Sequence, residues 1–336
     1  MNLRSYNTFK IDAKSNDFNE ITKEEQLQSI VPTTDHLLIL GGGSNILFTE
    51  DPKEKIIYIN TKGIKVLEEN SNEIFLEVAA GENWHDFVLW CVDHNYGGIE
   101  NLALIPGNVG TCPIQNIGAY GVEVKDVITQ VNFFSIETGK KQSLSNENCL
   151  FGYRNSIFKN ELKGKTIISS VVFKLSKGKH HLNRNYGIIN QRLDELFPNL
   201  PVDIKKISQA VISIRSEKLP NPKEIGNAGS FFKNPVITEK AFSELQKKHP
   251  DIPNYPALNG VKVPAGWLID QLGLKGFEYG GAAVHKKQAL VLINHSGQAK
   301  GTDVYKLAKE IQGKVKEFYG INLEIEVNIY PNSFSF

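Results

Sequence analysis

A single hydroxyl, that of Ser230, is a candidate for proton transfer in this sequence. It lies in the segment Asn227-Ala-Gly-Ser-Phe-Phe-Lys-Asn-Pro235, between small residues and an aromatic pair. No His-Asp pair occurs nearby in the sequence, so nothing there would convert the hydroxyl into a nucleophile. A serine held in position can still donate a proton to a strongly basic carbanion. We therefore predict that Ser230 acts as a proton donor.

The segment Gly41-Gly-Gly-Ser-Asn45 follows an apolar run and predicts a loop with several accessible backbone N–H groups. Such a loop suits a pyrophosphate, because no side chains shield these groups. The segment matches neither the GxGxxG motif nor the P-loop. Taken alone, a glycine cluster more often forms an ordinary tight surface turn. A bulky residue at Gly43 is predicted to obstruct the pyrophosphate and to leave the protein folded.

The run from Ile105 to Gly121 contains four glycines and two prolines among amides that include Gln115 and Asn116. This pattern predicts a backbone that passes close to a flat or bulky group, with amides able to bond the edge of a heterocycle. The alternative is a buried, glycine-rich connection between domains. Cys112 within the run is interpreted as a small packing residue.

Three cations next to a turn or a helix end are candidates for binding an anion. Arg154 lies in Phe151-Gly-Tyr-Arg-Asn-Ser156, and its planar guanidinium can make two parallel hydrogen bonds to a carboxylate. Arg215 and Lys218 end a predicted helix, where the helix dipole alone favours cations. For each of them a solvated side chain is the alternative.

The stretch 323–330 alternates apolar and polar residues and predicts a strand with Glu324 and Glu326 on one face. Two solvated carboxylates are the alternative, which we prefer for Glu324.

The composition bounds the classes of protein to be considered. A length of 336 residues predicts two or three domains, and 38 basic against 37 acidic residues argue against a nucleic-acid or membrane surface. The three cysteines and eight histidines show no metal-ligand spacing, so no metal site is predicted. The N-terminal residues lack the basic and apolar regions of a signal peptide. A cytoplasmic, unprocessed protein is expected.

Hydrophobic periodicity predicts the main elements. Strands are expected at 36–40, 55–59, 74–78, 127–136, 166–175 and 289–293, and helices at 82–95, 188–197, after Asp203 and at 303–319. In the last helix we expect Val304, Leu307, Ile311, Val315 and Phe318 to face inward, and Gly320 to end it. The change of composition after Leu219-Pro-Asn-Pro222 is the predicted domain boundary.

Taken together, the segments around Gly41, Ile105, Phe151 and Asn227 resemble the UDP-N-acetylenolpyruvoylglucosamine reductase (MurB) family, in the type with a tyrosine-bearing insertion. The resemblance runs from Asn7 to Val327. It implies an α+β fold: a two-lobed FAD-binding domain, like that of p-cresol methylhydroxylase (PCMH) and vanillyl-alcohol oxidase, followed by a C-terminal α+β substrate-binding domain. The implied divisions are 1–62 and 63–218 for the two FAD-binding lobes, with an insertion at 177–198, then 219–320 for the substrate domain and 321–336 for a strand returning to the active site.

The same resemblance implies the activity and the site residues. The enzyme would be an FAD-dependent oxidoreductase that uses NADPH to reduce the enolpyruvyl ether of UDP-N-acetylglucosamine, with no obligate protein partner. Catalysis would rest on Arg154, Ser230 and Glu326. FAD would contact Gly41, Gly42, Gly43, Ser44, Asn45, Gly110, Gln115, Asn116, Ile117, Gly121 and Arg215. The substrate would contact Tyr153, Tyr186, Lys218, Asn234 and Gln288.

Two other functions are the alternatives to this reductase, and the residues argue against each of them. A flavin-dependent oxidase of the same broad fold would need a general base near the flavin, and the Ser230 segment contains none. A flavin- or nucleotide-binding protein without turnover would lack one of the three catalytic residues, all of which are present. The insertion at 177–198 is further predicted to close over the substrate through Tyr186.

Overall fold

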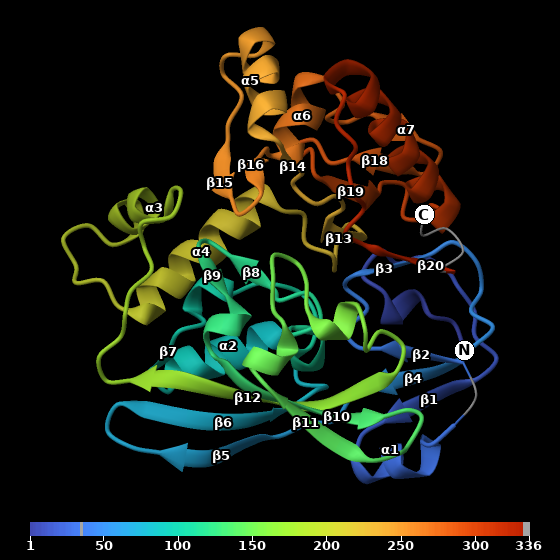
Figure 1. The fold of residues 1–336 in the computed structure, drawn as a ribbon, viewed down its shortest axis with the longest axis vertical. Helices are drawn as coiled ribbons and strands as arrows, with labels where there is room; N and C mark the ends of the chain where they lie inside the picture. The colour runs from blue at the N-terminus through green and yellow to red at the C-terminus, as the bar shows by residue number, and fades with distance from the viewer. Residues whose placement is uncertain (34–35, 332–336) are drawn as a thin grey trace. The chain divides into compact units, whose positions relative to one another are not determined.

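The computed structural model describes residues 1–33 and 36–331, and the chain folds as two compact units (Figure 1). Unit 1 combines Met1–Ser15, Gly43–Pro52 and the chain from Lys218 onward. Unit 2 combines Asn16–Gly42 and Lys53–Glu217. The chain therefore passes between the units four times, and two short N-terminal segments belong to the unit that holds the C-terminal half.

Unit 2 contains a three-stranded parallel sheet in the order β1-β4-β2. The strands are β1 (Phe18–Ile21), β4 (Lys55–Ile59) and β2 (Leu37–Leu40), and helix α1 (Glu25–Ile30) connects β1 to β2. The short apolar runs of β2 and β4 supply buried side chains, which is why these strands were predictable from sequence.

The second sheet of unit 2 is antiparallel and carries most of the core of this unit. Its order is β11-β10-β12-β6-β5, with β7 paired to β12. Helix α2 (Trp84–Asp93) lies on one face of this sheet (Figure 1), where the Phe87 and Phe173 rings are 5.1 Å apart. The strands are β5 (Ile64–Glu69), β6 (Glu73–Ala79), β7 (Tyr96–Gly97), β10 (Ile128–Ser135), β11 (Lys141–Ser145) and β12 (Thr166–Lys177).

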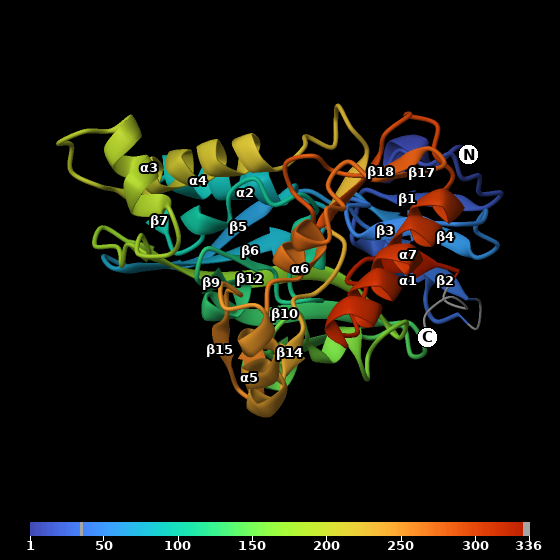
Figure 2. The ribbon, with the colours of Figure 1, turned by 90° about the horizontal axis from the view of Figure 1, so that it is seen from above.

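Two further helices of unit 2 follow β12. Figure 2 shows α3 (Ile189–Leu196) beside α4 (Ile204–Lys218), and Arg192 Nη1 on α3 donates to Ser213 Oγ on α4 at 2.6 Å. Asp203 begins α4 as predicted, because its Oδ1 accepts from the Lys206 N–H at 2.7 Å. A small hairpin, β8 (Gly118–Ala119) with β9 (Val122–Glu123), lies between α2 and β10 in the chain.

The described part of unit 1 is built on short strands and three α-helices. Its main sheet has the order β13-β19-β18-β17, from Asn227–Ser230, Val291–Asn294, Ala282–Val284 and Glu278–Tyr279. A second sheet has the order β14-β16-β15, from Val236–Ile237, Gly260–Lys262 and Tyr255–Ala257. Strand β3 (Ile46–Phe48) pairs in parallel with β20 (Asn328–Tyr330). The helices are α5 (Glu239–Lys248), α6 (Ala265–Gln271) and α7 (Gly301–Tyr319).

Most of the prediction for helix α7 is confirmed, but the predicted burial of Phe318 is wrong. Gly320 ends the helix with φ 69°, the left-handed conformation that glycine adopts without strain. Phe318 was expected to face inward, but 61% of its surface is exposed. Its ring lies 4.9 Å from that of Tyr319 and 5.8 Å from that of His249. The last turn of α7 thus contributes to an exposed aromatic cluster instead of the core.

The strand predicted at 323–330 is interrupted. Only β20 (Asn328–Tyr330) is a regular strand, and Ile325 forms an isolated antiparallel bridge with Phe232. This segment therefore pairs with two different parts of unit 1, which divides the expected strand. The last residues of the predicted C-terminal segment, 332–336, lie outside the described residues.

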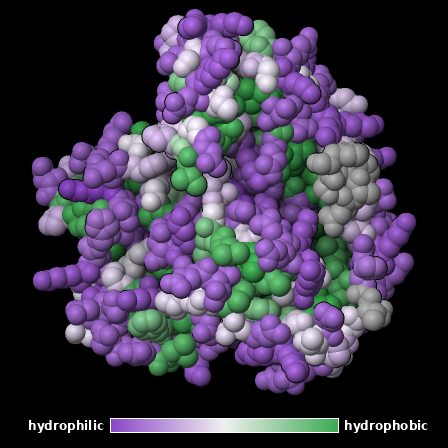
Figure 3. Space-filling model, viewed as in Figure 1, coloured by the Kyte–Doolittle hydropathy of each residue, from purple (hydrophilic) through white to green (hydrophobic). Residues whose placement is uncertain are grey.

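The surface is mixed in polarity. On the face drawn in Figure 3, apolar residues form separate patches among polar ones. Among the described residues, none of the helices combines the length and the apolar character that a membrane crossing requires.

Candidate functional site

The two glycine-rich segments predicted from sequence are in contact within unit 2. A Cβ at Gly42 would lie 2.8 Å from Asn108 Oδ1 and 3.0 Å from Gly107 Cα. A Cβ at Gly41 would lie 2.7 Å from Thr111 Cγ2. Glycine is needed here because the loop after β2 packs directly on the 107–111 segment.

The backbone N–H groups of Gly41, Gly42 and Gly43 have no hydrogen-bond acceptor among residues 1–33 and 36–331. Successive N–H groups without acceptors form a concave site for an anion. The loop thus has the donors that a pyrophosphate requires.

The surroundings of Gly43 contradict the expectation that a bulky residue there would leave the protein folded. It has φ 60°, and a Cβ there would lie 1.9 Å from the Tyr6 carbonyl oxygen and 2.9 Å from Asn7 Cα. A valine at this position would collide with the backbone of unit 1, so the folded apoprotein that we expected for Gly43→Val is not compatible with the structure.

The Ile105–Gly121 segment is held by the protein itself at several points. Gly110 N–H donates to the Ala80 carbonyl at 2.8 Å, and a Cβ on Gly110 would lie 2.5 Å from Ala80 Cβ. Asn116 is fully buried, and its Nδ2 donates to Glu123 Oε2 at 2.9 Å and to the Gly152 carbonyl at 3.0 Å. Its amide therefore shapes the loop. Gln115 and Ile117 are half-buried neighbours in the same segment.

Arg154 lies in a tight turn whose ends, Gly152 and Asn155, exchange backbone hydrogen bonds of 3.0 and 3.2 Å. Its φ is 52°, a conformation that costs a non-glycine residue energy and persists where surrounding contacts enforce it. Nη2 donates to the Gly118 carbonyl at 2.8 Å. The guanidinium also lies 5.6 Å from the ring centre of Tyr153, which is 41% exposed. The turn thus places Arg154 against the β8 end of the glycine-rich segment.

Arg215 is a half-buried cation with an unused donor. Its Nε is buried and has no hydrogen-bond partner among the described residues. Burial lowers the pKa of its guanidinium, the neighbouring Tyr120 raises it, and Arg154 lowers it again. Two arginines close enough to influence each other favour an anionic ligand between or beside them. The pKa of the Tyr120 hydroxyl is raised by burial and lowered by Arg215.

Tyr186, on the insertion at 177–198, contacts the same hairpin. Its ring lies edge-on to Tyr120 with centres 6.3 Å apart, and a Cβ on Gly121 would lie 3.3 Å from Tyr186 Cδ2. Half of the Tyr186 surface remains exposed. Gly121 therefore makes room for this tyrosine.

Ser230 ends β13 just after a β-bulge in unit 1. Asn227 pairs with Ile293 and Ser230 with Val291, so three steps along β13 match two along β19. Gly229 lies in this bulge with φ 69°, and its N–H donates to Asn227 Oδ1 at 2.9 Å. Bulges commonly re-aim a side chain next to a functional site. Ser230 is exposed, while the following Phe231 is fully buried.

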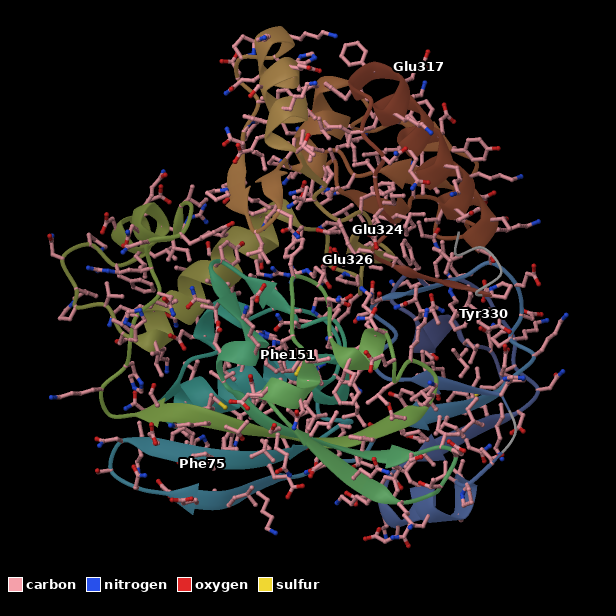
Figure 4. The ribbon with its side chains drawn as sticks, in the orientation of Figure 1. Phe75, Phe151, Glu317, Glu324, Glu326 and Tyr330 are labelled. Atoms are coloured by element: carbon pink, nitrogen blue, oxygen red, sulfur yellow. The ribbon has the colours of Figure 1, made fainter. Side chains whose placement is uncertain are left out.

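Glu326 is linked to the Ser230 segment by the backbone. Its N–H donates to the Phe231 carbonyl at 2.9 Å, and Lys233 N–H donates to the Glu324 carbonyl at 2.9 Å. Figure 4 shows Glu324 and Glu326 close together on the chain that leads into β20. Glu324 is 69% exposed at its side chain and forms an ion pair with Lys233.

The side chains of Asn234 and Gln288 both lie beside the first residues of α6. Asn234 Oδ1 accepts from Ala265 N–H at 3.0 Å, and a Cβ on Gly266 would lie 3.4 Å from Gln288 Oε1. Unit 1 therefore brings these two predicted substrate contacts together. Lys218 is exposed at the end of α4.

Comparison with known proteins assigns both parts of the chain. Residues 20–145 match the FAD binding domain family, and residues 221–330 match the UDP-N-acetylenolpyruvoylglucosamine reductase C-terminal domain. A UDP-N-acetylenolpyruvoylglucosamine reductase from Flavobacterium johnsoniae is 48% identical over 97% of both chains. One from Neisseria gonorrhoeae is 46% identical over 99% of this chain and 97% of its own. The chain belongs to the MurB family.

A solved structure agrees with the fold of this MurB family member. The crystal structure of MurB from Thermus caldophilus, at 24% identity, covers 98% of each chain with a TM-score of 0.69. The fold is thus the expected combination of an FAD-binding domain with a MurB C-terminal domain, and the protein is an FAD-dependent oxidoreductase.

The residues present fit FAD. Three N–H groups without acceptors in the Gly41–Gly43 loop and the unpartnered Arg215 Nε are donors, within the described residues, suited to the anionic parts of this cofactor. Within the described part of the chain, no three His, Cys, Asp or Glu side chains are grouped as metal ligands.

Sequence reasoning missed Tyr120, Asn101 and Glu100 in this MurB family member. Tyr120 lies within the glycine-rich segment and has φ 52°, but nothing in its local pattern separates it from its neighbours. Asn101 and Glu100 are 1% exposed and precede that segment. The partners of Asn101 are 19 and 82 residues away, so no local signal could have marked it. Glu100 accepts from the Gly98 N–H two residues earlier, but nothing in that short sequence marks the carboxyl as buried.

Proposed function

We propose that this protein reduces the enolpyruvyl ether of UDP-N-acetylglucosamine to UDP-N-acetylmuramate with NADPH and FAD. This is a cytoplasmic step in the synthesis of peptidoglycan precursors for the cell wall. The observation that carries the proposal is Ser230, an exposed hydroxyl directed by a bulge, on a segment whose backbone is bonded to that of Glu326. The activity for which the relatives at 46–48% identity are named supports it.

The chain offers residues to hold the cofactor in its FAD-binding part. The Gly41–Gly43 N–H groups would bind the pyrophosphate, with Ser44 and Asn45 continuing the loop. Gly110, Gln115, Asn116, Ile117 and Gly121 would shape the wall that faces the flavin, and Arg215 would donate from Nε to it. When bound, FAD would accept hydride from NADPH and supply it to the substrate.

Arg154 is proposed to bind the substrate carboxylate. When hydride adds to the vinyl CH2 carbon, negative charge develops at the adjacent carbon and in its carboxylate. A guanidinium fixed by the Gly118 carbonyl would stabilise this charge without having to reorient. Glu326 is proposed to act near the same reacting carbon.

Ser230 is proposed to complete the reduction. The hydroxyl proton moves from Oγ to the carbon that bears the carboxylate, which forms the new C–H bond and leaves the serine oxygen to regain a proton. The hydroxyl has no hydrogen bond to another described residue, so its proton is not already committed within that part of the chain. General acid catalysis of this kind contributes about 10² to 10⁴ in rate.

The nucleotide part of the substrate is assigned to polar and aromatic side chains. In unit 1, the Nδ2 group of Asn234 has no acceptor among the described residues, because only its Oδ1 is used, by Ala265. Gln288 next to it and Lys218 would add further donors for a diphosphate. In unit 2, Tyr153 and Tyr186 expose ring surface suited to contact with the sugar and base.

An anaerobic titration tests this function. The purified protein should show flavin absorption that bleaches with NADPH and returns when the enolpyruvyl ether is added, and the product should gain the mass of one hydride and one proton. Bleaching by an alcohol instead of by NADPH, followed by reoxidation with oxygen, would indicate an oxidase. A spectrum that does not respond to NADPH would indicate a binding protein and would contradict the proposal.

A further inference from the structure

The insertion at 177–198 is fixed to unit 2 on both sides of Tyr186. Before it, His180 Nδ1 lies 2.8 Å from Ser176 Oγ and Nε2 lies 3.0 Å from Asn95 Oδ1. After it, α3 buries Ile189 and Leu193 in the core. The short stretch between these anchors contains Gly187 at φ 58°, where a Cβ would have no atom of a described residue within 4 Å. The geometry of this short stretch therefore decides where Tyr186 lies.

Asn101 connects this stretch to the hairpin that Tyr186 contacts. Its Nδ2 donates to the Asn183 carbonyl at 2.7 Å and to the Tyr120 carbonyl at 3.4 Å. Asn183 precedes Tyr186 by three residues, and the Tyr120 ring is the one that Tyr186 packs against. One buried amide thus joins the base of the Tyr186 stretch to the surface on which Tyr186 rests.

The chemistry of this connection requires an amide. Both partners are carbonyl oxygens, which only accept hydrogen bonds, so the side chain between them must present N–H groups. Asn101 is 1% exposed, and its Oδ1 is buried without a partner among the described residues, so its contribution comes through Nδ2. A carboxylate of the same shape would face two carbonyl oxygens with no proton to offer.

We infer that Asn101 is a positioning residue, which holds the Asn183 end of the insertion to the Tyr120 hairpin so that Tyr186 is presented to the substrate. This inference rests on the proposed function. Loss of the two hydrogen bonds would let the stretch around Tyr186 occupy other positions. The fraction of molecules competent to bind would fall, which raises the apparent KM.

The first test compares Asn101→Asp with Asn146→Asp. Asn146 Nδ2 also donates to two backbone carbonyls, those of Lys125 and Ile128, each at 2.7 Å, and both lie outside the insertion. Asn101→Asp should raise the KM for the UDP-sugar about tenfold, as expected for losing a buried hydrogen bond, with flavin reduction by NADPH unchanged. Asn146→Asp should leave that KM unchanged. An unchanged KM in Asn101→Asp, or equal effects of the two substitutions, would overturn the inference.

The second test is a double-mutant cycle with Tyr186→Ala. If Asn101 acts through Tyr186, the KM effect of Asn101→Asp should disappear in the Tyr186→Ala background. Full additivity would show an ordinary structural role and would refute the inference. Should Asn101→Asp fail to fold, Asn101→Ser enters the same cycle, because its single O–H can serve only one of the two carbonyls.

Failure of the inference is distinguishable from failure of the proposed function. Wild-type protein that does not reduce the UDP-sugar would refute the function. If the wild-type protein reduces the UDP-sugar, two results would refute only the role of Asn101. One is a KM that Tyr186→Ala does not change, and the other is additive KM effects of Asn101→Asp and Tyr186→Ala.

Discussion

Nη2 of Arg154 donates a hydrogen bond of 2.8 Å to the carbonyl oxygen of Gly118, and Nη1 lies 3.4 Å from the carbonyl oxygen of Asn116. The arginine thereby reaches from its own turn to the glycine-rich segment 36 residues or more before it in the chain. Together with a backbone φ of 52°, this contact fixes the direction of the guanidinium before any ligand binds. A preorganised cation is what a developing carboxylate charge requires.

Arg154→Lys should therefore lower the rate of substrate reduction about 10² to 10³-fold, the usual effect of removing one preorganised donor. Lysine keeps the charge but has no planar fork to span the carbonyl and a carboxylate. The rate is measured by single-turnover mixing of the reduced protein with substrate. Arg4→Lys is the matched control, because Arg4 Nη2 also donates to a glycine carbonyl, that of Gly297, at 2.6 Å. A similar rate in both variants would show that any surface arginine behaves like Arg154.

Gly43→Ala should destabilise the protein by more than about 2 kcal/mol, since the φ of 60° and the approach of the Tyr6 carbonyl both disfavour a side chain. Gly313→Ala should do the opposite. Gly313 lies in α7 with no atom of the described residues near its Cβ position, so alanine should stabilise by about 0.5 to 1 kcal/mol through helix propensity. Urea unfolding of both variants measures the difference. If Gly43→Ala were as stable as the wild type, this would contradict the close approach of the Tyr6 carbonyl to Gly43.

Glu100 predicts a dependence of stability on pH. Burial raises the pKa of this carboxyl above 4.5, and the Gly98 N–H, 2.6 Å from Oε2, only partly offsets that rise. The folded protein binds this proton more tightly than the unfolded chain, so stability from this group is fully present below the unfolded pKa and is lost as pH rises through the folded pKa. Glu100→Gln removes the charge and keeps an acceptor for Gly98. It should melt above wild type at pH 8 and at the same temperature near pH 4, whereas a gap independent of pH would rule out this origin.

Local signals account for the parts of the fold that were predictable. The end of α7 at Gly320, the start of α4 after Asp203 and the strand at 55–59 each follow from residues within one turn or one strand. Phe318 was mispredicted because helical periodicity continues past the point where the core ends. The division of the C-terminal strand also had no local signal, since its pairing with Phe232 and with β3 depends on distant residues.

The candidate site shows the same limit. The glycine patterns predicted close backbone approach, but not that Tyr6 approaches Gly43 or that Tyr186 occupies the space beside Gly121. The catalytic roles of Arg154 and Glu326 were predicted by resemblance to a family, which also supports the role predicted for Ser230 from its own segment. An isolated arginine or glutamate carries no chemical signal of its own. Asn101 could not be found, because its partner Asn183 is 82 residues away.

The central claim is that Ser230 supplies the proton in the second half of the reaction, and stopped-flow spectroscopy of Ser230→Ala tests it most directly. NADPH should bleach the flavin of this variant at the wild-type rate, because that half-reaction needs no proton from the serine. Reoxidation by the enolpyruvyl ether should be slower than in wild type by about 10² to 10⁴-fold. Equal slowing of both phases, or reoxidation at the wild-type rate, would contradict the account.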